Sequence, residues 1–298
     1  MTKSVVYNTA PQYSPLTLAS YYAGPALMVV CHLGALLCLV TGLSLGAGLW
    51  IGLLYWVRML ATTAIYHRLL THKAYNTPTV VKWIGSLVGA SAGQMGPSWW
   101  KAHHEAHHRF TDRPGDPHTS TRGFWWSHYQ WLLSKTSLPT SLPADIEQDP
   151  VLRAIDRLHF LPLLALGGVS YVLGGWEYVA AFCLSTVLLF HGVALVNSAC
   201  HKWGDRPFET ADASRNNGVV ALLTLGEGWH NLHHAVPWSA RQGITIDSDQ
   251  IRYLPDATFR FIQGLQYCGL ASQVRVPTAT VIQKFAKPAP GATGHPVP

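Results

Sequence analysis

The sequence carries very little charge. Only 12% of its 298 residues are Asp, Glu, Lys or Arg, whereas a soluble domain has roughly 25%. Hydrophobic residues make up 48% of the chain. This balance argues against a conventional soluble enzyme and favours a protein whose surface lies largely in lipid.

Paired cysteines and a removable leader are also missing. The five cysteines form no CxxC pair and mostly lie in or beside apolar runs, so we interpret them as small buried hydrophobic residues that require no oxidising compartment. Residues 1–14 contain no short apolar core followed by a cleavage site, and we therefore expect no signal peptide.

Long apolar runs are present instead. Residues 25–47 and 49–66 form one pair, separated by a Gly-rich turn at 45–48, and residues 160–175 and 178–199 form a second pair, separated around Gly174 and Gly175. A helix needs about 20 apolar residues to cross a bilayer. The sequence therefore predicts an all-α integral membrane protein with four transmembrane helices in two hairpins. Residues 80–96 are short and rich in Gly and Ser, which favours a buried or re-entrant segment.

The basic residues predict the orientation. The two turns expected on the outer side hold no Lys or Arg, while residues 67–157 hold ten and residues 201–298 hold nine. By the positive-inside rule, both termini and the long central segment face the cytosol. The net charge of +6 then fits an anionic inner leaflet better than a nucleic acid partner. Arg58 lies within the second run, where it either snorkels or pairs inside the bundle.

Histidines cluster beside the predicted cytosolic ends of the spans. The stretch KAHHEAHHRF, residues 101–110, holds four, and the others lie in HRLLTH (67–72), VNSACH (196–201) and HNLHH (230–234). A histidine run can be a solvated surface patch, but three such boxes and His201 on one membrane face indicate a metal site. We predict that they converge in a histidine-rich cytosolic cap.

The spacing selects the candidate ligands. Positions i, i+3 and i+4 share one helix face, so HxxHH selects His104, His107, His108, His230, His233 and His234. His103 does not fit this template. His67 and His72 are five residues apart, roughly 140° around an ideal α-helix, so we expect them to contact different metals or to have a helix end between them. With His201 these are nine candidates, too many for one zinc-like site of about four ligands. Imidazole suits Zn, Cu, Fe and Ni alike, so the identity of the metal stays open at this point.

The boxes and their flanks resemble the membrane fatty acyl desaturases of the stearoyl-CoA (Δ9) type. WWKAHHEAHHRFTD, GDPHTSTRGFWWSH and GEGWHNLHHAVPWSARQG are similar to bacterial members, and the resemblance covers roughly residues 25–275. It implies a single desaturase domain spanning 1–298 in a bacterial inner membrane, with a di-iron centre in the cap. The implied iron ligands are His67, His72, His104, His107, His108, His201, His230, His233 and His234, together with Asn197 through a water molecule.

The resemblance also implies the reaction and its partners. A fatty acyl chain would be desaturated with O₂, and electrons would come from an external donor of the ferredoxin, rubredoxin or cytochrome b5 type with its reductase. No residue beyond the iron ligands is assigned a catalytic role. Glu105 and Glu227 flank the boxes, where either can support a ligand imidazole.

Four residues are predicted to line the substrate channel: Tyr55, Met59, Gln94 and Trp100. A bulky Met59 suggests a preference for C16 or shorter chains, although ordinary lipid-facing packing explains it equally well. Met95 and Ala194 depart from the residues of animal members. The acyl carrier (CoA, acyl carrier protein or lipid) and the bond position therefore stay open.

Two alternatives to desaturation remain. The same iron site in a sister enzyme would support hydroxylation, acetylenation or decarboxylation to a terminal alkene. A membrane metal transporter is the non-enzymatic alternative, but transport favours ionisable ligands near mid-membrane, whereas these histidines lie beyond the span ends. We expect structural roles for His32, His118, His128, His159 and His191, and disorder in the proline-rich tail 287–298.

Overall fold

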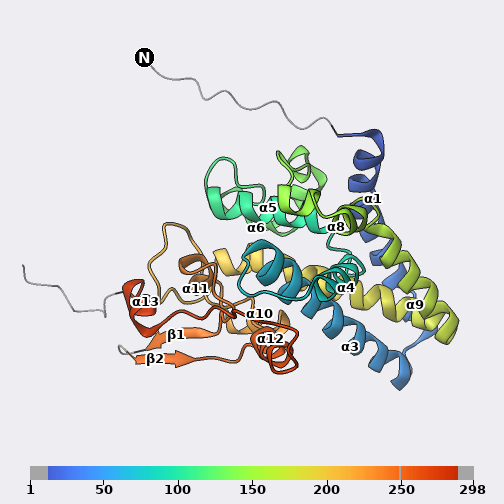
Figure 1. The fold of residues 1–298 in the computed structure, drawn as a ribbon. Helices are drawn as coiled ribbons and strands as arrows, with labels where there is room; N and C mark the ends of the chain where they lie inside the picture. The colour runs from blue at the N-terminus through green and yellow to red at the C-terminus, as the bar shows by residue number, and fades with distance from the viewer. Residues whose placement is uncertain (1–12, 248–249, 288–298) are drawn as a thin grey trace, which may run out of the picture.

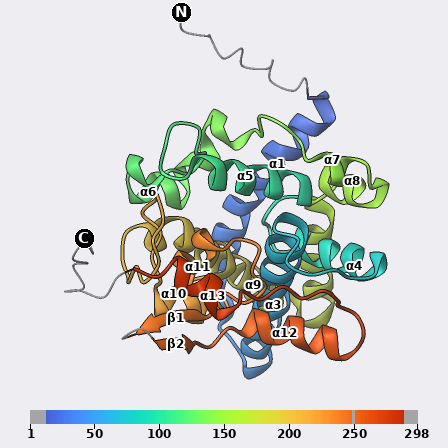
Figure 2. The same cartoon turned by 60° about the vertical axis from the view of Figure 1, so that its left-hand side comes forward.

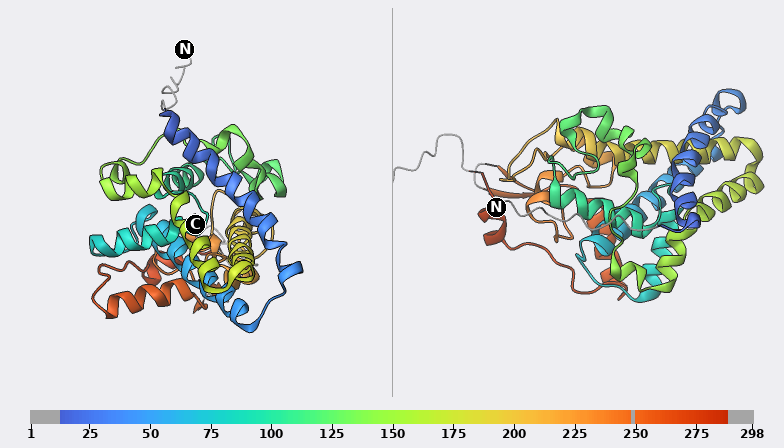
Figure 3. Two further views of the ribbon diagram at one scale, coloured as in Figure 1. Left: turned by 90° about the vertical axis from the view of Figure 1, so that its right-hand side faces the viewer. Right: turned by 90° about the horizontal axis from the view of Figure 1, so that it is seen from above.

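The computed structural model describes residues 13–247 and 250–287. Three long helical segments form one end of the molecule, and shorter helices with a small sheet gather at the other end, which we call the cap (Figures 1 and 3). The three segments are long and apolar enough to cross a membrane: Pro15–Thr41, Leu45–Thr71 and Phe160–His201.

The first hairpin turns earlier than the sequence predicts. It contains α1 (Pro15–Ala35), the short α2 (Cys38–Thr41), α3 (Leu45–Leu60) and the π-helix η1 (Ala61–Thr71). The predicted turn at 45–48 is wrong, because α3 already begins at Leu45 and contains both Gly46 and Gly48. The turn occupies 42–44 instead, where Gly42 adopts a φ of 70° and the Ser44 side chain accepts a hydrogen bond from Ala47 N at 3.2 Å.

The second hairpin lies within α9 (Phe160–Ser198), which continues into η5 (Ala199–His201). Gly174 and Gly175 interrupt it with non-helical backbone, including a φ of 62° at Gly175 that favours glycine. This interruption coincides with the second predicted turn, and it divides the 42-residue apolar segment into two arms (Figure 1).

The segment 80–96 is too short to cross the bilayer. Its helix α4 (Thr79–Ala90) has 12 residues and spans roughly 18 Å at 1.5 Å per residue, against a hydrocarbon core of about 30 Å. The short length agrees with the prediction that this segment does not cross the membrane, but Val80, Ile84 and Leu87 are exposed, so α4 is not a buried segment. Residues 91–96 then lead to α5 (Pro97–Phe110), which carries the second histidine box.

Arg58 points into the bundle. Its guanidinium donates hydrogen bonds to Ser185 Oγ at 2.9 Å and Thr186 Oγ1 at 2.7 Å, and to the carbonyl oxygens of Leu54 and Ser91. Hydroxyl and carbonyl oxygens of neighbouring helices therefore satisfy this buried cation, which does not snorkel to the membrane surface.

The cap contains short helices and one sheet (Figure 2). The remaining helices are η2 (Ser120–Arg122), α6 (Phe124–His128), η3 (Gln130–Leu133), η4 (Lys135–Ser137), α7 (Ala144–Glu147), α8 (Pro150–Arg157), α10 (Gly218–Leu223), α11 (His230–Ala235), α12 (Ala257–Tyr267) and α13 (Ala279–Lys284).

The two strands are β1 (Ile244–Asp247) and β2 (Gln250–Tyr253), paired antiparallel with Ile244 opposite Tyr253. The all-α prediction is therefore wrong at this point. The buried Ile244 packs with Phe208, Leu232 and Val236, so the sheet anchors the segment that follows the third histidine box. The predicted disorder of the tail falls, beyond Lys287, outside the described residues.

Candidate metal centre

The nine candidate histidines converge in two groups. Each group holds four imidazoles whose ligand atoms all lie within 4.8 Å of one another. Nε2 of His108 lies 3.0 Å from Nε2 of His104 and 2.8 Å from Nε2 of His233, which adds His108 to the first group. Site A is therefore His67, His72, His104, His108 and His233, and site B is His107, His201, His230 and His234.

The helix type explains why His67 and His72 share a site. The expectation that they contact different metals assumed an α-helix, but η1 is a π-helix, in which residues five apart are one turn apart. His72 N donates to His67 O at 3.1 Å, the i to i+5 pattern. The helix ends at Thr71, so the alternative of a helix end between the two histidines agrees with the structure.

The second and third boxes each contribute to both sites. On α5, His104 and His108 lie in site A while His107 lies in site B; on α11, His230 and His234 lie in site B while His233 lies in site A. The rings of His108 and His234 stack with their centroids 4.7 Å apart. The two sites are therefore neighbours, and the same two helices hold them.

The nitrogen positions fit metal ions. Within the sites, pairs of Nε2 atoms approach to between 2.8 and 3.1 Å. Two metal–imidazole bonds of about 2.0–2.1 Å at a right angle place their nitrogens about 3 Å apart. Burial, and then the neighbouring imidazoles, hold the pKa of His104, His108, His230 and His233 well below the ordinary range. These rings are therefore neutral near pH 7, as metal ligands must be.

Three carboxylates orient the imidazoles of site B. Nδ1 of His107, His201 and His234 lies 3.1, 3.1 and 3.0 Å from Asp116, Asp112 and Asp212. An ionised carboxylate only accepts, so each Nδ1–H donates and each Nε2 is left free for a metal. Burial alone would raise the pKa of Asp116, but contact with His107 and then His118 lowers it to about 2. None of the three carboxylates is predicted from the sequence, although Asp112 and Asp116 follow the second box closely.

Site A is supported by one carboxylate, that of Glu227, which is paired with Arg68. Glu227 pairs with His67 Nδ1 and also accepts hydrogen bonds from Arg68, at 2.9 Å from Nη2. Arg68 in turn pairs with Asp256 at 2.9 Å, and all three charged side chains are buried. The contact between Glu227 and His67 Nδ1 agrees with the supporting role predicted for Glu227. Glu105 is half exposed and lies 3.7 Å from Lys101 instead.

His103 lies outside both sites. Its Nδ1 is 2.8 Å from Trp99 O and its Nε2 is 3.0 Å from Thr136 O. Both ring nitrogens therefore face backbone carbonyls, of which a neutral ring can donate to one, and the ring packs against Trp99 and Trp131. His118 belongs to neither group of four, but its ligand atom lies within 4.8 Å of those of His107 and Asp116, and its Nδ1 is 3.8 Å from Asp116 Oδ1.

Comparison with known proteins agrees with this centre. The fatty acid desaturase family model matches residues 41–244. An sn-1 stearoyl-lipid 9-desaturase of Anabaena variabilis is 38% identical over 82% of this chain and 90% of its own length. An acyl-CoA C20 Delta5-desaturase of Anemone leveillei is 37% identical over 73% of this chain and 70% of its own length.

The chain belongs to the fatty acid desaturase family. It is an oxidoreductase of the fatty acyl desaturase class, as the sequence predicts. A palmitoyl-monogalactosyldiacylglycerol delta-7 desaturase of Arabidopsis thaliana is also similar, with 36% identity over 76% of this chain and 62% of its own length.

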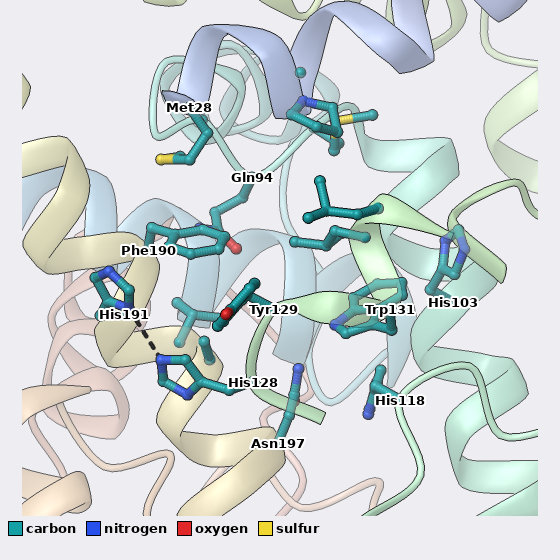
Figure 4. A pocket seen from close by; sticks show the side chains of 18 of the residues that line it. Met28, Gln94, His103, His118, His128, Tyr129, Trp131, Phe190, His191 and Asn197 are labelled. Atoms are coloured by element: carbon teal, nitrogen blue, oxygen red, sulfur yellow. Dashed lines mark hydrogen bonds between the residues drawn. The ribbon is translucent and has the colours of Figure 1, made fainter. Parts of the chain in front are cut away.

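Two cavities of the desaturase meet beside the histidines. The larger has a volume of about 380 Å³ and the smaller about 40 Å³. Trp100, His104, Val193 and Asn197 line both, so the cavities adjoin each other beside His104 of site A. Figure 4 shows Asn197 at the larger cavity, with the side chains of Gln94 and Phe190 also projecting into it.

The predicted channel residues divide between these cavities. Gln94 lines the larger one, Trp100 lines both, and the fully buried Met59 lines the smaller one. Tyr55 lines neither; it packs beside Met59 and its hydroxyl donates to Leu223 O. Met59 is therefore not a lipid-facing residue.

The contribution of the second box can be tested by metal content. We expect His104→Ala to lose metal because it removes a site A nitrogen, whereas His103→Ala keeps the full content because its ring lies outside both sites and faces backbone carbonyls. Elemental analysis of the two purified variants and the parent gives the comparison. Equal losses in both variants would contradict the assignment.

The carboxylate support of site B gives a second test. Asp212→Asn replaces the carboxylate that faces His234 Nδ1–H with a neutral amide, which is a weaker acceptor, and losing such a charged partner lowers metal affinity by about 10- to 100-fold. We expect titration with a chelator to release one of two metal ions early from this variant. Glu105→Gln is the matched control, because Glu105 is half exposed and contacts no ligand; early release from the control as well would remove the role of Asp212.

Proposed function

We propose that this desaturase forms a double bond, in the cis configuration, in a fatty acyl chain through an O₂-dependent reaction at a non-haem di-iron centre. The observation that carries this proposal is the convergence of nine imidazoles on two adjacent points beside an apolar cavity. When bound, the irons supply the oxidising power to remove hydrogen from an unactivated CH₂ group, which side chains alone lack.

The chain's own residues hold and shield this chemistry. The five histidines of site A would bind one iron and the four of site B the other, with Asn197 reaching an iron through water. Asp112, Asp116 and Asp212 fix three imidazoles of site B, and the Arg68–Glu227 pair fixes His67. The apolar cavities hold the acyl chain and exclude water, so position along the chain decides which C–H bonds react.

We propose that the protein spans a bacterial inner membrane four times. The non-helical backbone at Gly174 and Gly175 supports counting the third apolar segment as two spans. With the basic residues concentrated in 67–157 and 201–298, both termini and the cap lie in the cytosol. The cap and spans then form one domain.

An external protein supplies the electrons in this proposal. The described residues contain no haem or flavin domain, so a donor of the ferredoxin, rubredoxin or cytochrome b5 type, with its reductase, must reach the cap from the cytosol. Relatives are named as acting on acyl-CoA or on lipid-linked chains, and a fatty acyl thioester or lipid ester is accordingly the substrate class.

Expression in a host with few unsaturated lipids tests the reaction. We expect mass spectrometry of the total acyl chains to show a new monoene, and its bond position measures the distance from the carboxyl end to the irons. Hydroxylated, alkynyl or terminal-alkene products would instead show that the protein catalyses one of the sister oxidations. Metal uptake into vesicles without any oxygen-dependent product would contradict the enzyme assignment.

The smaller cavity gives a prediction about chain length. Met59→Ala enlarges this cavity, so we expect the ratio of C18 to C16 product to rise by about tenfold, near the lower end of what one methylene contributes in an apolar pocket. Val57→Ala on the exposed face of α3 is the control. An unchanged product ratio would show that Met59 does not limit the chain.

A further inference from the structure

The larger cavity has an uncharged lining. Its wall combines apolar and aromatic side chains with histidines, one glutamine and one asparagine, and none of its lining residues is Asp, Glu, Lys or Arg. At its inner end it reaches His104 and Asn197. A group that enters here must therefore be bound without a cationic or anionic partner from the wall.

Exposed apolar side chains mark the mouth of this cavity. Leu33 of α1 and Leu133 of η3 both line the cavity, and they are 62% and 70% exposed. The most apolar stretch of the Pro15–Thr41 segment is only 11% buried within the protein. If that segment crosses the membrane, the mouth opens sideways into the bilayer.

The other side of the mouth is formed by residues 124–133, FWWSHYQWLL, which we call the aromatic segment. Trp125, Tyr129 and Leu133 are exposed, a pattern typical of residues at a membrane interface. The aromatic segment thus presents apolar surface next to α1, where a soluble cap would present charge.

A string of histidines fixes the aromatic segment to the spans. His128 lies 2.9 Å from Ser198 Oγ and 2.9 Å from Nδ1 of His191, as Figure 4 shows for the histidine pair. His191 continues the string to His32 of α1 at 3.1 Å. His191 precedes His201 by ten residues, roughly 15 Å along a helix, so the segment is attached at membrane depth and both sides of the mouth are tied together.

The chemistry of this entrance selects between acyl carriers. The head of coenzyme A bears several phosphates, and acyl carrier proteins are large polar molecules; neither fits an uncharged mouth that faces lipid. A lipid ester already lies in the bilayer, and its chain needs no charged contact to enter. From these observations we propose that the desaturase acts on a chain still esterified to a membrane lipid, which enters sideways between α1 and the aromatic segment. This proposal rests on the proposed desaturase function.

A competition experiment tests the carrier. The full-length, iron-loaded protein is placed in phosphatidylglycerol vesicles whose palmitoyl chains carry one isotope label, and palmitoyl-CoA and palmitoyl-acyl carrier protein with other labels are added. A single chemical reduction followed by O₂ allows one turnover without the electron donor. We expect the monoene in the phosphatidylglycerol fraction. Monoene only in the CoA or carrier-protein fraction overturns the lipid proposal and leaves the desaturase function intact. The absence of monoene from all three labelled fractions contradicts both proposals.

The entrance itself is tested by narrowing it. Leu33→Trp adds bulk at the mouth, and we expect lipid desaturation to fall by about tenfold, the order of effect that overfilling a packed site produces. Val30→Trp is the matched control, because Val30 lies on the same helix, is 58% exposed and does not line the cavity. Equal activity in the two variants overturns the proposed route.

A binding measurement separates entry from chemistry. Metal-free protein is irradiated in vesicles of phosphatidylglycerol that carries a photoreactive acyl chain, and the labelled peptides are mapped. We expect label in α1 and in the aromatic segment, reduced in Leu33→Trp and retained in Val30→Trp. Label confined to the outer surfaces of α3 and α9 would contradict entry through this mouth.

Discussion

Nine imidazole nitrogens directed at two points are the constraint around which the structure is built. Without a cation between them, nitrogens about 3 Å apart repel, and burial removes the water that would screen them. The fold opposes this repulsion with fixed acceptors behind the rings. Four carboxylates each accept a hydrogen bond from a histidine Nδ1–H, so that Nε2 of the same ring is directed at one of the two points. They are Asp112, Asp116, Asp212 and Glu227. A metal ion bound at either point would therefore stabilise the folded cap.

These acceptors also hold distant parts of the chain together. Asp256 pairs with Arg68, accepts the backbone N–H groups of Gln242 and Gly243, and caps α12 through Phe259 N. The buried arginine thereby links the end of the second span to the segment after the third box. Leaving either carboxylate without Arg68 would bury an unpaired charge, which is strongly destabilising. The two sites differ in this support, since site B has three carboxylates and site A has one.

The sequence predicts the parts of this centre that depend on local spacing. HxxHH on an α-helix is enough to select His104 over His103, because side-chain direction follows helical geometry. Partners that approach from elsewhere in the chain, such as Asp212 behind His234 or Asp256 behind Arg68, have no local signature. The first hairpin turn is predicted at the wrong position because glycines usually mark turns, whereas Gly46 and Gly48 lie inside α3, which Ser44 caps. The β-hairpin was missed because its short strands gain their stability from packing against Phe208 and Leu232.

The type of helix determines which spacing between two histidines brings their side chains to one site. In η1, the five-residue step from His67 to His72 closes one turn, whereas in an α-helix a step of four closes one turn. A chain with one residue fewer between these histidines would bring the same two nitrogens to site A if this turn tightened to an ordinary α-helix. The wider turn of η1 thus lets the longer spacing in HRLLTH direct both imidazoles at one site.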